Sequence, residues 1–355
     1  MTNIEKLMDA LPDERTCAVI TDETNRRYFT GFKSSDGIVV CFKDKAYFII
    51  DFRYYEKAAQ RVKGMEVILQ KEKEEQLAEL FVMHCAEVVM TESDTMTVTE
   101  LRKFTEEFGE DLYIDSSSAL SDIINGFRLI KSEDEIRKIL DAQSIAEETY
   151  LHVLSNIRRG MTEREVALMT DNKMKLLGAE DISFETIVLF GKNTSLPHGV
   201  PGNDILESGF VLMDFGAVID GYHSDMTRTF YAGAPSDEEK RAYDIVLQAQ
   251  QAALEAARPE MHAAELDAVA RNIIDSTEFK GSFGHSLGHG VGMEIHEMPR
   301  VSAKSDYILK EGMVITIEPG IYLPGKFGIR TENMGVITAD SFMNFTKSGR
   351  EFTVL

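Results

Sequence analysis

The sequence contains no apolar run long enough to cross a membrane and no apolar leader at its start. No stretch near the required length of about 18 consecutive apolar residues occurs. The opening segment, MTNIEKLMDALPDE, is charged and lacks the apolar stretch of about 7–15 residues and the small-residue cleavage site of a secretory signal. We therefore expect a cytoplasmic protein that does not insert into membranes.

Cysteines and basic side chains are also scarce. Cys17, Cys41 and Cys85 stand in apolar surroundings, which predicts buried free thiols. The 38 basic side chains are outnumbered by 60 acidic ones, and the resulting net charge of −22 repels phosphate backbones and anionic lipid surfaces. Nucleic acids and membranes are therefore not expected as partners.

The 355 residues and the 43% hydrophobic content are typical of a globular protein, and at ~150 residues per domain the length predicts two domains. Up to about residue 130, short β-branched or aromatic runs alternate with polar helical stretches, which predicts a small α/β domain. The predicted strands cover 17–20, 37–42, 46–50 and 87–90, and the predicted helices lie near 54–62 and 97–108.

The second domain begins where the pattern changes, so we place the domains at 1–128 and 129–355. Ser132 and Glu135 form a capping box that predicts a long helix ending near Gly160. Two further boxes begin at Thr162 and Ser236. The expected apolar stripe of the long helix is Ile136, Ile139, Leu140, Ile145, Leu151 and Leu154. Strands and turns dominate 186–230 and the region after 312, which predicts an α+β domain with a mostly antiparallel sheet.

A predicted hairpin carries the first chemical signal. Asp220-Gly221 is the dipeptide that favours a two-residue type I′ turn. With that turn, Asp214 lies opposite Thr227, and Asp225 becomes its diagonal neighbour on the same face, ~7–8 Å away between Cα atoms. Two carboxylates on one apolar-flanked face repel each other unless a cation offsets their charge. The spacing therefore favours a metal site over two unrelated strand and turn residues.

Six of the eight histidines lie between His198 and His296, and three of the six stand among glycines. His285 and His289 have the spacing of a zinc-binding helix, but no glutamate follows His285 and the glycines oppose a helix. The segment 284–288 matches a serine-hydrolase elbow, yet the strand before it and the helix after it are missing. We instead expect a glycine-rich segment whose histidines bind a ligand.

Two further carboxylates, Glu318 and Glu332, stand at the ends of predicted strands. Acids at such places are often only solvated. Here they complete a set of four carboxylates and one imidazole, namely Asp214, Asp225, His289, Glu318 and Glu332. Four negative charges balance two divalent cations, and hard oxygen ligands favour manganese, cobalt or ferrous iron over a single tetrahedral zinc.

In order and spacing, these residues resemble the signatures of the pita-bread metallopeptidases, which include methionine aminopeptidase, aminopeptidase P and prolidase. The resemblance covers about 132–355. It is carried by Pro197-His198-Gly199, Met213-Asp214-Phe215-Gly216, Ser224-Asp225, Gly288-His289-Gly290-Val-Gly292, His296-Glu297, Thr316-Ile-Glu318-Pro319-Gly320 and Arg330-Thr-Glu332. The residues before about 125, especially Asn25-Arg-Arg-Tyr-Phe-Thr-Gly-Phe32, resemble the N-terminal domain of creatinase, aminopeptidase P and prolidase.

The resemblance implies a pita-bread catalytic domain with a curved, mostly antiparallel sheet, preceded by a smaller creatinase-type α/β domain. It implies two divalent metal ions, with manganese preferred over cobalt, ferrous iron or zinc. Asp225 and Glu332 would bridge both metals, Asp214 would chelate one, and His289 with Glu318 would bind the other. His198, His296 and Glu318 would take part in catalysis, and His285, Arg300 and Arg330 would contact the substrate.

The resemblance also implies an activity. Methionine aminopeptidase lacks the N-terminal domain and creatinase lacks these ligands, which leaves prolidase and aminopeptidase P. Arg300 stands where prolidases hold the carboxylate of the C-terminal proline, and a guanidinium suits that group, although an arginine after proline is often only a surface residue. The expected reaction is hydrolysis of the Xaa-Pro bond in dipeptides by a metal-activated hydroxide. Aminopeptidase P, which acts on longer Xaa-Pro peptides, is the alternative.

A third interpretation is a non-catalytic peptide-binding scaffold on the same fold, but all five ligand residues are present. The family often has Glu-Asp where this chain has Glu332-Asn333, which keeps the ligand and changes its surroundings. The resemblance further implies a homodimer in which the N-terminal domain of one subunit shields the active site of the other, through the loop Phe32-Lys-Ser-Ser-Asp-Gly.

Overall fold

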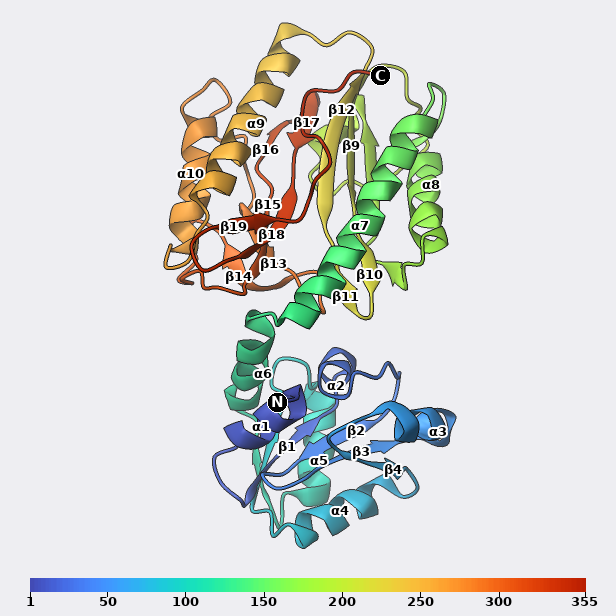
Figure 1. Cartoon of the computed structure of the whole chain (residues 1–355), viewed down its shortest axis with the longest axis vertical. Coiled ribbons are helices and arrows are strands. Elements are labelled where there is room, and N and C mark those ends of the chain that lie inside the picture. The colour runs from blue at the N-terminus through green and yellow to red at the C-terminus, as the bar shows by residue number, and fades with distance from the viewer. The chain divides into compact units, whose positions relative to one another are not determined.

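The computed structural model describes residues 1–355, and its contacts divide into two compact units, Met1–Arg128 and Leu129–Leu355 (Figure 1). Both units combine helices with sheets, in agreement with the predicted α+β class. None of the helices has the combined length and apolar character needed to cross a bilayer.

The first unit is built around a six-stranded mixed sheet. Its elements are α1 (Asn3–Ala10), β1 (Thr16–Ile20), α2 (Glu23–Thr30), β2 (Ile38–Cys41), β3 (Ala46–Ile50), α3 (Phe52–Arg61), β4 (Glu66–Leu69), α4 (Lys73–Met83), β5 (Val88–Thr91), α5 (Val98–Phe108), β6 (Tyr113–Asp115) and α6 (Ala119–Leu129). The strand order is β4-β3-β2-β1-β5-β6, with antiparallel pairs at its centre and parallel pairs outside. The predicted α/β architecture of this region is confirmed.

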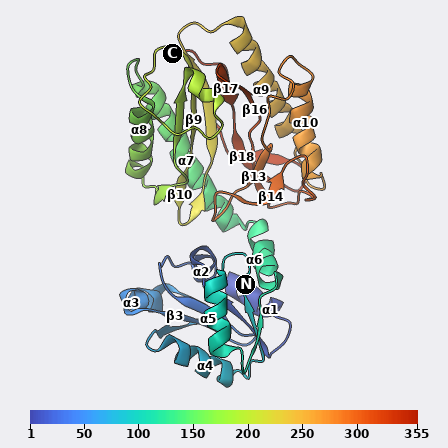
Figure 2. The ribbon, with the colours of Figure 1, turned by 180° about the vertical axis from the view of Figure 1, so that it is seen from behind.

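One face of this sheet packs against α4 and α5. Leu77 and Phe81 from α4 and Phe108 from α5 share a core with Val19 and Val40 from the central strands. In Figure 2, α5 lies in front of the sheet. The four predicted strands became β1, β2, β3 and β5 because their apolar runs match this buried layer.

The expectation of three buried thiols is wrong for Cys85. Cys17 and Cys41 are buried in β1 and β2, whereas Cys85 is exposed. Cys85 lies just after α4, where the backbone turns with a φ of 52° before β5 begins. The residues around Cys85 therefore form the connection between α4 and β5, and they do not bring the thiol into the core.

The second unit contains four long helices and several small sheets. Its elements are α7 (Glu133–Asn156), α8 (Glu163–Leu176), β7 (Asp181–Ile182), β8 (Ile187–Phe190), the 3-10 helix η1 (Gly191–Ser195), β9 (Gly209–Phe215), β10 (Ala217–Ile219), β11 (Tyr222–His223), β12 (Met226–Ala232), α9 (Asp237–Ala256), α10 (Ala263–Asp275), β13 (Gly288–Gly290), β14 (Glu297–Val301), β15 (Val314–Ile317), β16 (Gly320–Leu323), β17 (Phe327–Arg330), β18 (Asn333–Ile337) and β19 (Phe342–Asn344).

All strand pairs of this unit are antiparallel, as predicted. The strands form the sheets β12-β9-β8, β11-β10-β7, β14-β13-β15-β18-β19 and β16-β17. Helices α7 and α8 flank the strands on one side and α9 and α10 on the other in both ribbon views (Figures 1 and 2). Each helix pair shares an apolar core with the strands beside it. The arrangement is the predicted pita-bread fold.

The predicted capping boxes begin α7, α8 and α9. At Ser132, Thr162 and Ser236, the hydroxyl accepts a hydrogen bond from the N–H of the glutamate three residues later. The predicted apolar stripe of α7 is wrong at Leu151, which is 60% exposed. At this point of the helix, the buried side chain is the neighbouring Tyr150.

The predicted hairpin register is confirmed. Ile219 pairs with Tyr222 around the two-residue turn, and Asp220 and Gly221 have φ values of 49° and 84°. Asp214 lies opposite Thr227 in the β9–β12 ladder. The β10–β11 and β9–β12 pairs belong to separate sheets but keep the same register, so the turn predicts which residues lie opposite the acidic side chains.

Candidate metal centre

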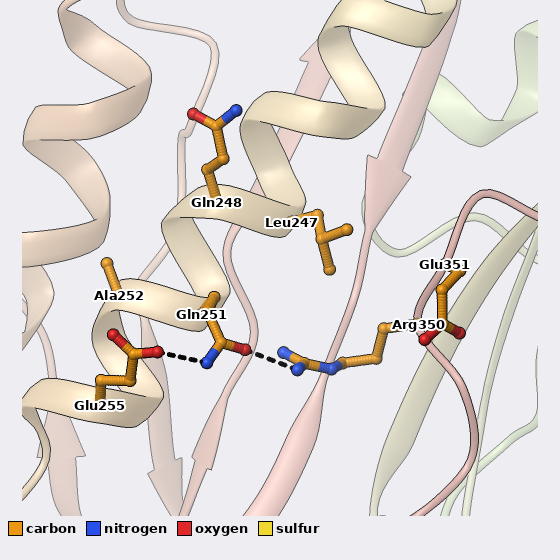
Figure 3. Close-up of a pocket in the computed structure, with 7 residues that line it drawn as sticks. All are labelled: Leu247, Gln248, Gln251, Ala252, Glu255, Arg350 and Glu351. Carbon is orange, nitrogen blue, oxygen red and sulfur yellow. Dashed lines mark hydrogen bonds between the residues drawn. The ribbon is translucent and has the colours of Figure 1, made fainter.

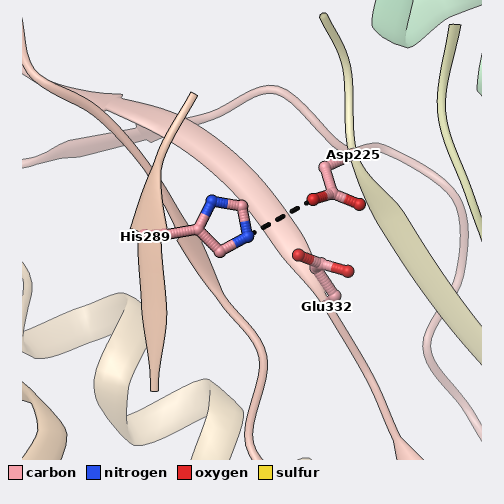
Figure 4. Close-up of side chains that lie close together, drawn as sticks. All are labelled: Asp225, His289 and Glu332. Carbon is pink, nitrogen blue, oxygen red and sulfur yellow. Dashed lines mark ion pairs between the residues drawn. The ribbon is translucent and has the colours of Figure 1, made fainter. Parts of the chain in front are cut away.

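Three predicted ligands from separate strand ends meet in the second unit. His289 lies in β13, Asp225 directly precedes β12, and Glu332 stands between β17 and β18. One ligand atom from each lies within 4.8 Å of the others (Figure 4). Nε2 of His289 is 3.5 Å from Oδ2 of Asp225. Asp225 and Glu332 are only 4% and 1% exposed, so two carboxylates are buried side by side.

The other two predicted ligands border this group. Oε1 of Glu318 lies 3.5 Å from Nε2 of His289. Nη2 of Arg330 donates to Oδ2 of Asp214 at 2.6 Å, and Nε of Arg330 is 4.0 Å from Oε2 of Glu318. Thus the structure brings all five predicted ligands together, two of them beside the buried guanidinium of Arg330.

Three carboxylates of this cluster, Asp225, Glu318 and Glu332, disfavour their ionised forms. Burial, followed by repulsion from Asp214, raises the pKa of Asp225 well above its ordinary value. Burial and repulsion from Asp225 do the same to the pKa of Glu332. Burial and the charge of Glu332 raise the pKa of Glu318 to about 8. Arg330 therefore does not fully offset these three carboxylates, and further positive charge would stabilise their ionised forms.

The open acceptors in the cluster fit a metal. Oδ1 of Asp214, Oδ1 of Asp225 and Oε1 of Glu332 are buried without a hydrogen-bond partner. A buried acceptor without a partner costs about 1–3 kcal/mol. Divalent cations bind such carboxylate oxygens, and the imidazole of His289 adds a nitrogen donor that manganese, iron, cobalt and zinc accept. The residues present therefore fit divalent metal ions.

Arg330 is bound on all sides. Besides Asp214, it donates from Nη1 to the Tyr322 hydroxyl at 2.6 Å and to the Pro197 carbonyl at 3.3 Å, and from Nε to Oγ1 of Thr227 at 3.0 Å. It is only 3% exposed. These contacts make Arg330 a counter-cation and anchor of the cluster rather than a group open to solvent.

The predicted histidines differ in their surroundings. Both ring nitrogens of His285 have partners, the Ser286 carbonyl at 2.8 Å and the Tyr322 hydroxyl at 3.0 Å. Burial and the charge of Arg330 lower the pKa of His285 to about 3, so it is neutral. His296 is exposed, and its ring lies edge-on to that of His289, with centroids 4.4 Å apart.

His198 and Arg300 both lie near the cluster. His198 is exposed and follows Pro197, whose carbonyl contacts Arg330. Arg300 pairs directly with His289 in the β13–β14 ladder, so the two side chains share one face. Arg300 is also exposed.

Two threonines that the sequence reasoning missed support the ligands. Oγ1 of Thr227 donates to Oε2 of Glu332 at 2.8 Å. Oγ1 of Thr316 accepts from the His289 backbone N–H at 3.1 Å and donates to Oε1 of Glu318 at 3.3 Å. Each threonine is a fully buried polar residue within an apolar strand, a pattern that the sequence already contained.

A buried ion pair on α10 holds the glycine-rich histidine segment. Arg271 binds both oxygens of Asp267, at 2.7 and 2.8 Å. Asp267 accepts from the Leu287 N–H at 3.1 Å, and Arg271 donates to the His285 carbonyl at 2.8 Å. No sequence motif indicates this role of the pair, because its partners are backbone atoms of the glycine-rich segment, which only folding brings close to α10.

The substitution noted at Asn333 affects the region behind Glu332. The Asn333 side-chain oxygen accepts from Nη2 of Arg228 at 3.1 Å, and Nη1 of Arg228 also donates to the Glu332 carbonyl. Arg228 is buried, and burial lowers the pKa of its guanidinium to about 10. A neutral amide therefore faces this buried cation.

Comparison with known proteins agrees with the fold and the residue set. Residues 137–339 match metallopeptidase family M24, and residues 4–130 match the creatinase/prolidase N-terminal domain. An Xaa-Pro dipeptidase of Pyrococcus furiosus is 37% identical over 353 residues, which cover 98% of each chain.

Two solved structures superpose on nearly the whole chain. The Xaa-Pro dipeptidase from Bacillus anthracis has a TM-score of 0.93 at 36% identity, over 99% of each chain. The X-Pro aminopeptidase from Thermotoga maritima has a TM-score of 0.92 at 34% identity, over 100% of each chain. The backbone is thus equally close to a dipeptidase and to an aminopeptidase.

Proposed function

The chain belongs to metallopeptidase family M24, and from this premise we propose that it hydrolyses the Xaa-Pro bond of dipeptides with two divalent metal ions. The observation that carries the proposal is the meeting of four carboxylates and His289, with open buried oxygens on Asp214, Asp225 and Glu332. A scaffold that had lost catalysis would be expected to have lost ligands from this set, so the enzyme is the better interpretation.

From the family resemblance, Asp225 and Glu332 would hold both metal ions, Asp214 would hold one, and His289 and Glu318 would hold the other. Manganese is the proposed metal, with cobalt, ferrous iron or zinc as alternatives, because most of the donors are oxygens. When bound, the metal pair would polarise the scissile carbonyl and lower the pKa of a water molecule. Arg330 neutralises part of the carboxylate charge, and its contact with the substrate stays a prediction that rests on the family resemblance.

The chain's own residues would then handle protons and charge. Glu318, whose Oε1 is held by Thr316, is placed to pass a proton toward the proline nitrogen. Proline needs such a dedicated site because its peptide nitrogen carries no hydrogen that an ordinary peptidase could bind. His198 and His296 are exposed beside the cluster and would stabilise the negative charge that develops on the carbonyl oxygen.

Substrate length depends on Arg300. Arg300 pairs with His289 in the β13–β14 ladder, and this pairing supports the proposal that its guanidinium would bind the carboxylate of a C-terminal proline. Cleavage of longer Xaa-Pro peptides is the second candidate, and the similarity to the Thermotoga maritima X-Pro aminopeptidase favours it. Comparing kcat/KM for Xaa-Pro and Xaa-Pro-Xaa separates the two, since a clear preference for the longer peptide would favour the aminopeptidase.

The activity itself is tested with a panel of Xaa-Pro dipeptides. The protein is stripped with a chelator, and manganese, cobalt, iron or zinc is added back. We expect release of free proline only after metal addition. If no metal restores cleavage of any Xaa-Pro peptide, the proposed function is wrong.

We also propose a homodimer, in which the loop that begins at Phe32 shields the partner's active site. The proposal rests on the family to which the chain belongs. Sedimentation analysis at micromolar concentration should give about twice the 39.9 kDa mass of one chain, and a mass near that of one chain would reject the dimer.

A further inference from the structure

We propose that Gln250 is a positioning residue that holds Glu318 and Glu332 in place at the same time. The inference deepens the proposed function and rests on it, because it takes these two glutamates as metal ligands. Gln250 lies on α9, a helix that carries none of the proposed ligands.

One side-chain amide contacts the two segments that lead into these ligands. Gln250 is fully buried, and its Nε2 donates to the Ile317 carbonyl at 3.2 Å and to the Thr331 carbonyl at 2.8 Å. Ile317 and Thr331 directly precede Glu318 and Glu332. The amide therefore connects the end of β15 with the segment between β17 and β18.

Each of these two peptide groups is held at its other end as well. The Glu318 N–H donates to the Leu287 carbonyl at 2.8 Å, and the Glu332 N–H donates to the Thr227 carbonyl at 3.1 Å. Because a peptide group is planar and rigid, fixing its carbonyl and its N–H fixes the position of the next Cα atom, from which the glutamate side chain leaves. Gln250 supplies the carbonyl contact for both glutamates.

Arg350, which lies outside the metal-ligand cluster, determines the orientation of the Gln250 amide. Its Oε1 accepts from Nη1 of Arg350 at 3.2 Å, and Nη2 of Arg350 donates to Gln251 at 2.6 Å. Gln251 in turn donates to Glu255 at 2.6 Å (Figure 3). Arg350 and Gln251 lie in the wall of a pocket of about 440 Å³ that contains none of the proposed site residues. The amide oxygen thus faces the cation and its nitrogen faces the two carbonyls.

Only an amide satisfies all of these partners. A carboxylate would accept from Arg350 but would repel the two carbonyl oxygens, and an apolar side chain would leave both carbonyls without this donor. Loss of Gln250 should therefore loosen the two glutamates relative to His289 and Asp225, and weaken metal binding without removing any ligand.

The test compares two glutamines of α9. Gln250→Met removes the donor to both carbonyls, and Gln248→Met changes an exposed glutamine of the same helix that is not part of the chain through Arg350. Manganese titration of metal-free protein by calorimetry should show affinity about 10–100-fold weaker for Gln250→Met, the usual loss when a partner of a metal ligand is removed. Gln248→Met should stay within about twofold of the unmodified protein.

A second readout reports ligand geometry without any substrate. The visible absorption spectrum of the cobalt-loaded protein should change for Gln250→Met and not for Gln248→Met. A manganese affinity within twofold and an unchanged cobalt spectrum for Gln250→Met would overturn the proposal. If Gln250→Met does not fold, Gln250→Glu keeps the size and the acceptor for Arg350 but removes the donors, and the same two measurements apply.

The outcome for the unmodified protein separates this inference from the proposed function. If the unmodified protein binds no metal, the proposed function fails. If it binds metal and the two glutamine variants behave alike, only the positioning role of Gln250 fails.

Discussion

Both domains bury carboxylates, but the hydrogen bonds that these carboxylates accept differ between the two domains. In the first domain, Glu92 is 1% exposed, and its oxygens accept from the N–H groups of Thr21 and Asp22 at 2.7 and 3.0 Å and from the Asn25 amide at 2.8 Å. In the second domain, Asp225 and Glu332 are equally buried and each keeps an oxygen without a partner. Burial raises the pKa of all three groups, so burial alone does not identify a functional acid.

The difference lies in the remaining acceptor sites. A buried carboxylate whose oxygens all accept hydrogen bonds from the protein stabilises its own domain. A buried carboxylate with an oxygen that has no hydrogen-bond donor can bind a cation. The histidines divide in the same way, since His285 uses both ring nitrogens within the chain while His296 is exposed beside His289. The contact of His285 with the substrate stays a prediction, and the experiments that follow test the division between bound and open groups.

The largest effect is expected from a bridging carboxylate. Asp225→Ala should remove both metals and essentially all Xaa-Pro cleavage, because each metal loses a ligand and the other carboxylates still repel one another. Mass spectrometric metal analysis of the purified variant, together with proline release, measures both effects. Retention of two metals by Asp225→Ala would show that the bridging assignment is wrong.

An effect of intermediate size is expected at His296. His296→Ala should keep both metals and lower kcat by ~10²–10³, the usual cost of removing one group that stabilises the developing oxyanion. His152→Ala, on α7, serves as the control and should change neither quantity. Loss of metal from His296→Ala would instead make His296 a ligand or a support of one.

A smaller and selective effect is expected at Arg300. Arg300→Ala should lower kcat/KM for an Xaa-Pro dipeptide by ~10–100-fold, mostly through KM, because a hydrogen bond to a charged group contributes about 1.5–3 kcal/mol. An Xaa-Pro tripeptide, whose carboxylate lies one residue further away, should be affected much less. Equal losses for both peptides would contradict the carboxylate clamp.

The smallest effect on activity is expected in the first domain. Glu92→Gln should lower the free energy of unfolding by about 1–3 kcal/mol, because the amide oxygen can replace the oxygen that accepts from Thr21 and Asp22 but its NH2 group cannot accept from the Asn25 amide. Manganese affinity and kcat should not change. Urea denaturation followed by circular dichroism measures the free energy of unfolding, and calorimetric titration measures the manganese affinity. A loss of manganese affinity would contradict the proposed difference between the two domains.

Local chemistry explains which features were predictable from the sequence. The turn dipeptide Asp220-Gly221 determines the hairpin register, and with it the position of Asp214 opposite Thr227. The capping boxes locate the starts of α7, α8 and α9 because each box is complete within four residues. Cys85 and Leu151 were misplaced because apolar neighbours do not tell which way a side chain points when the backbone turns or when a helix is half covered.

The sequence by itself determined which groups are available: carboxylates and histidines in motifs whose order and spacing match family M24. Only the tertiary structure decided which of them remain open. Arg330 and His285 belong to the same motifs as the ligands, yet one is bound by Asp214 and Tyr322 and the other by Ser286 and Tyr322. Gln250 carries no motif, and its role arises because folding brings two distant strand ends within reach of one amide. A hydrogen-bond partner that is distant in the chain leaves no local pattern, so the division between bound and open groups appears only in the folded protein.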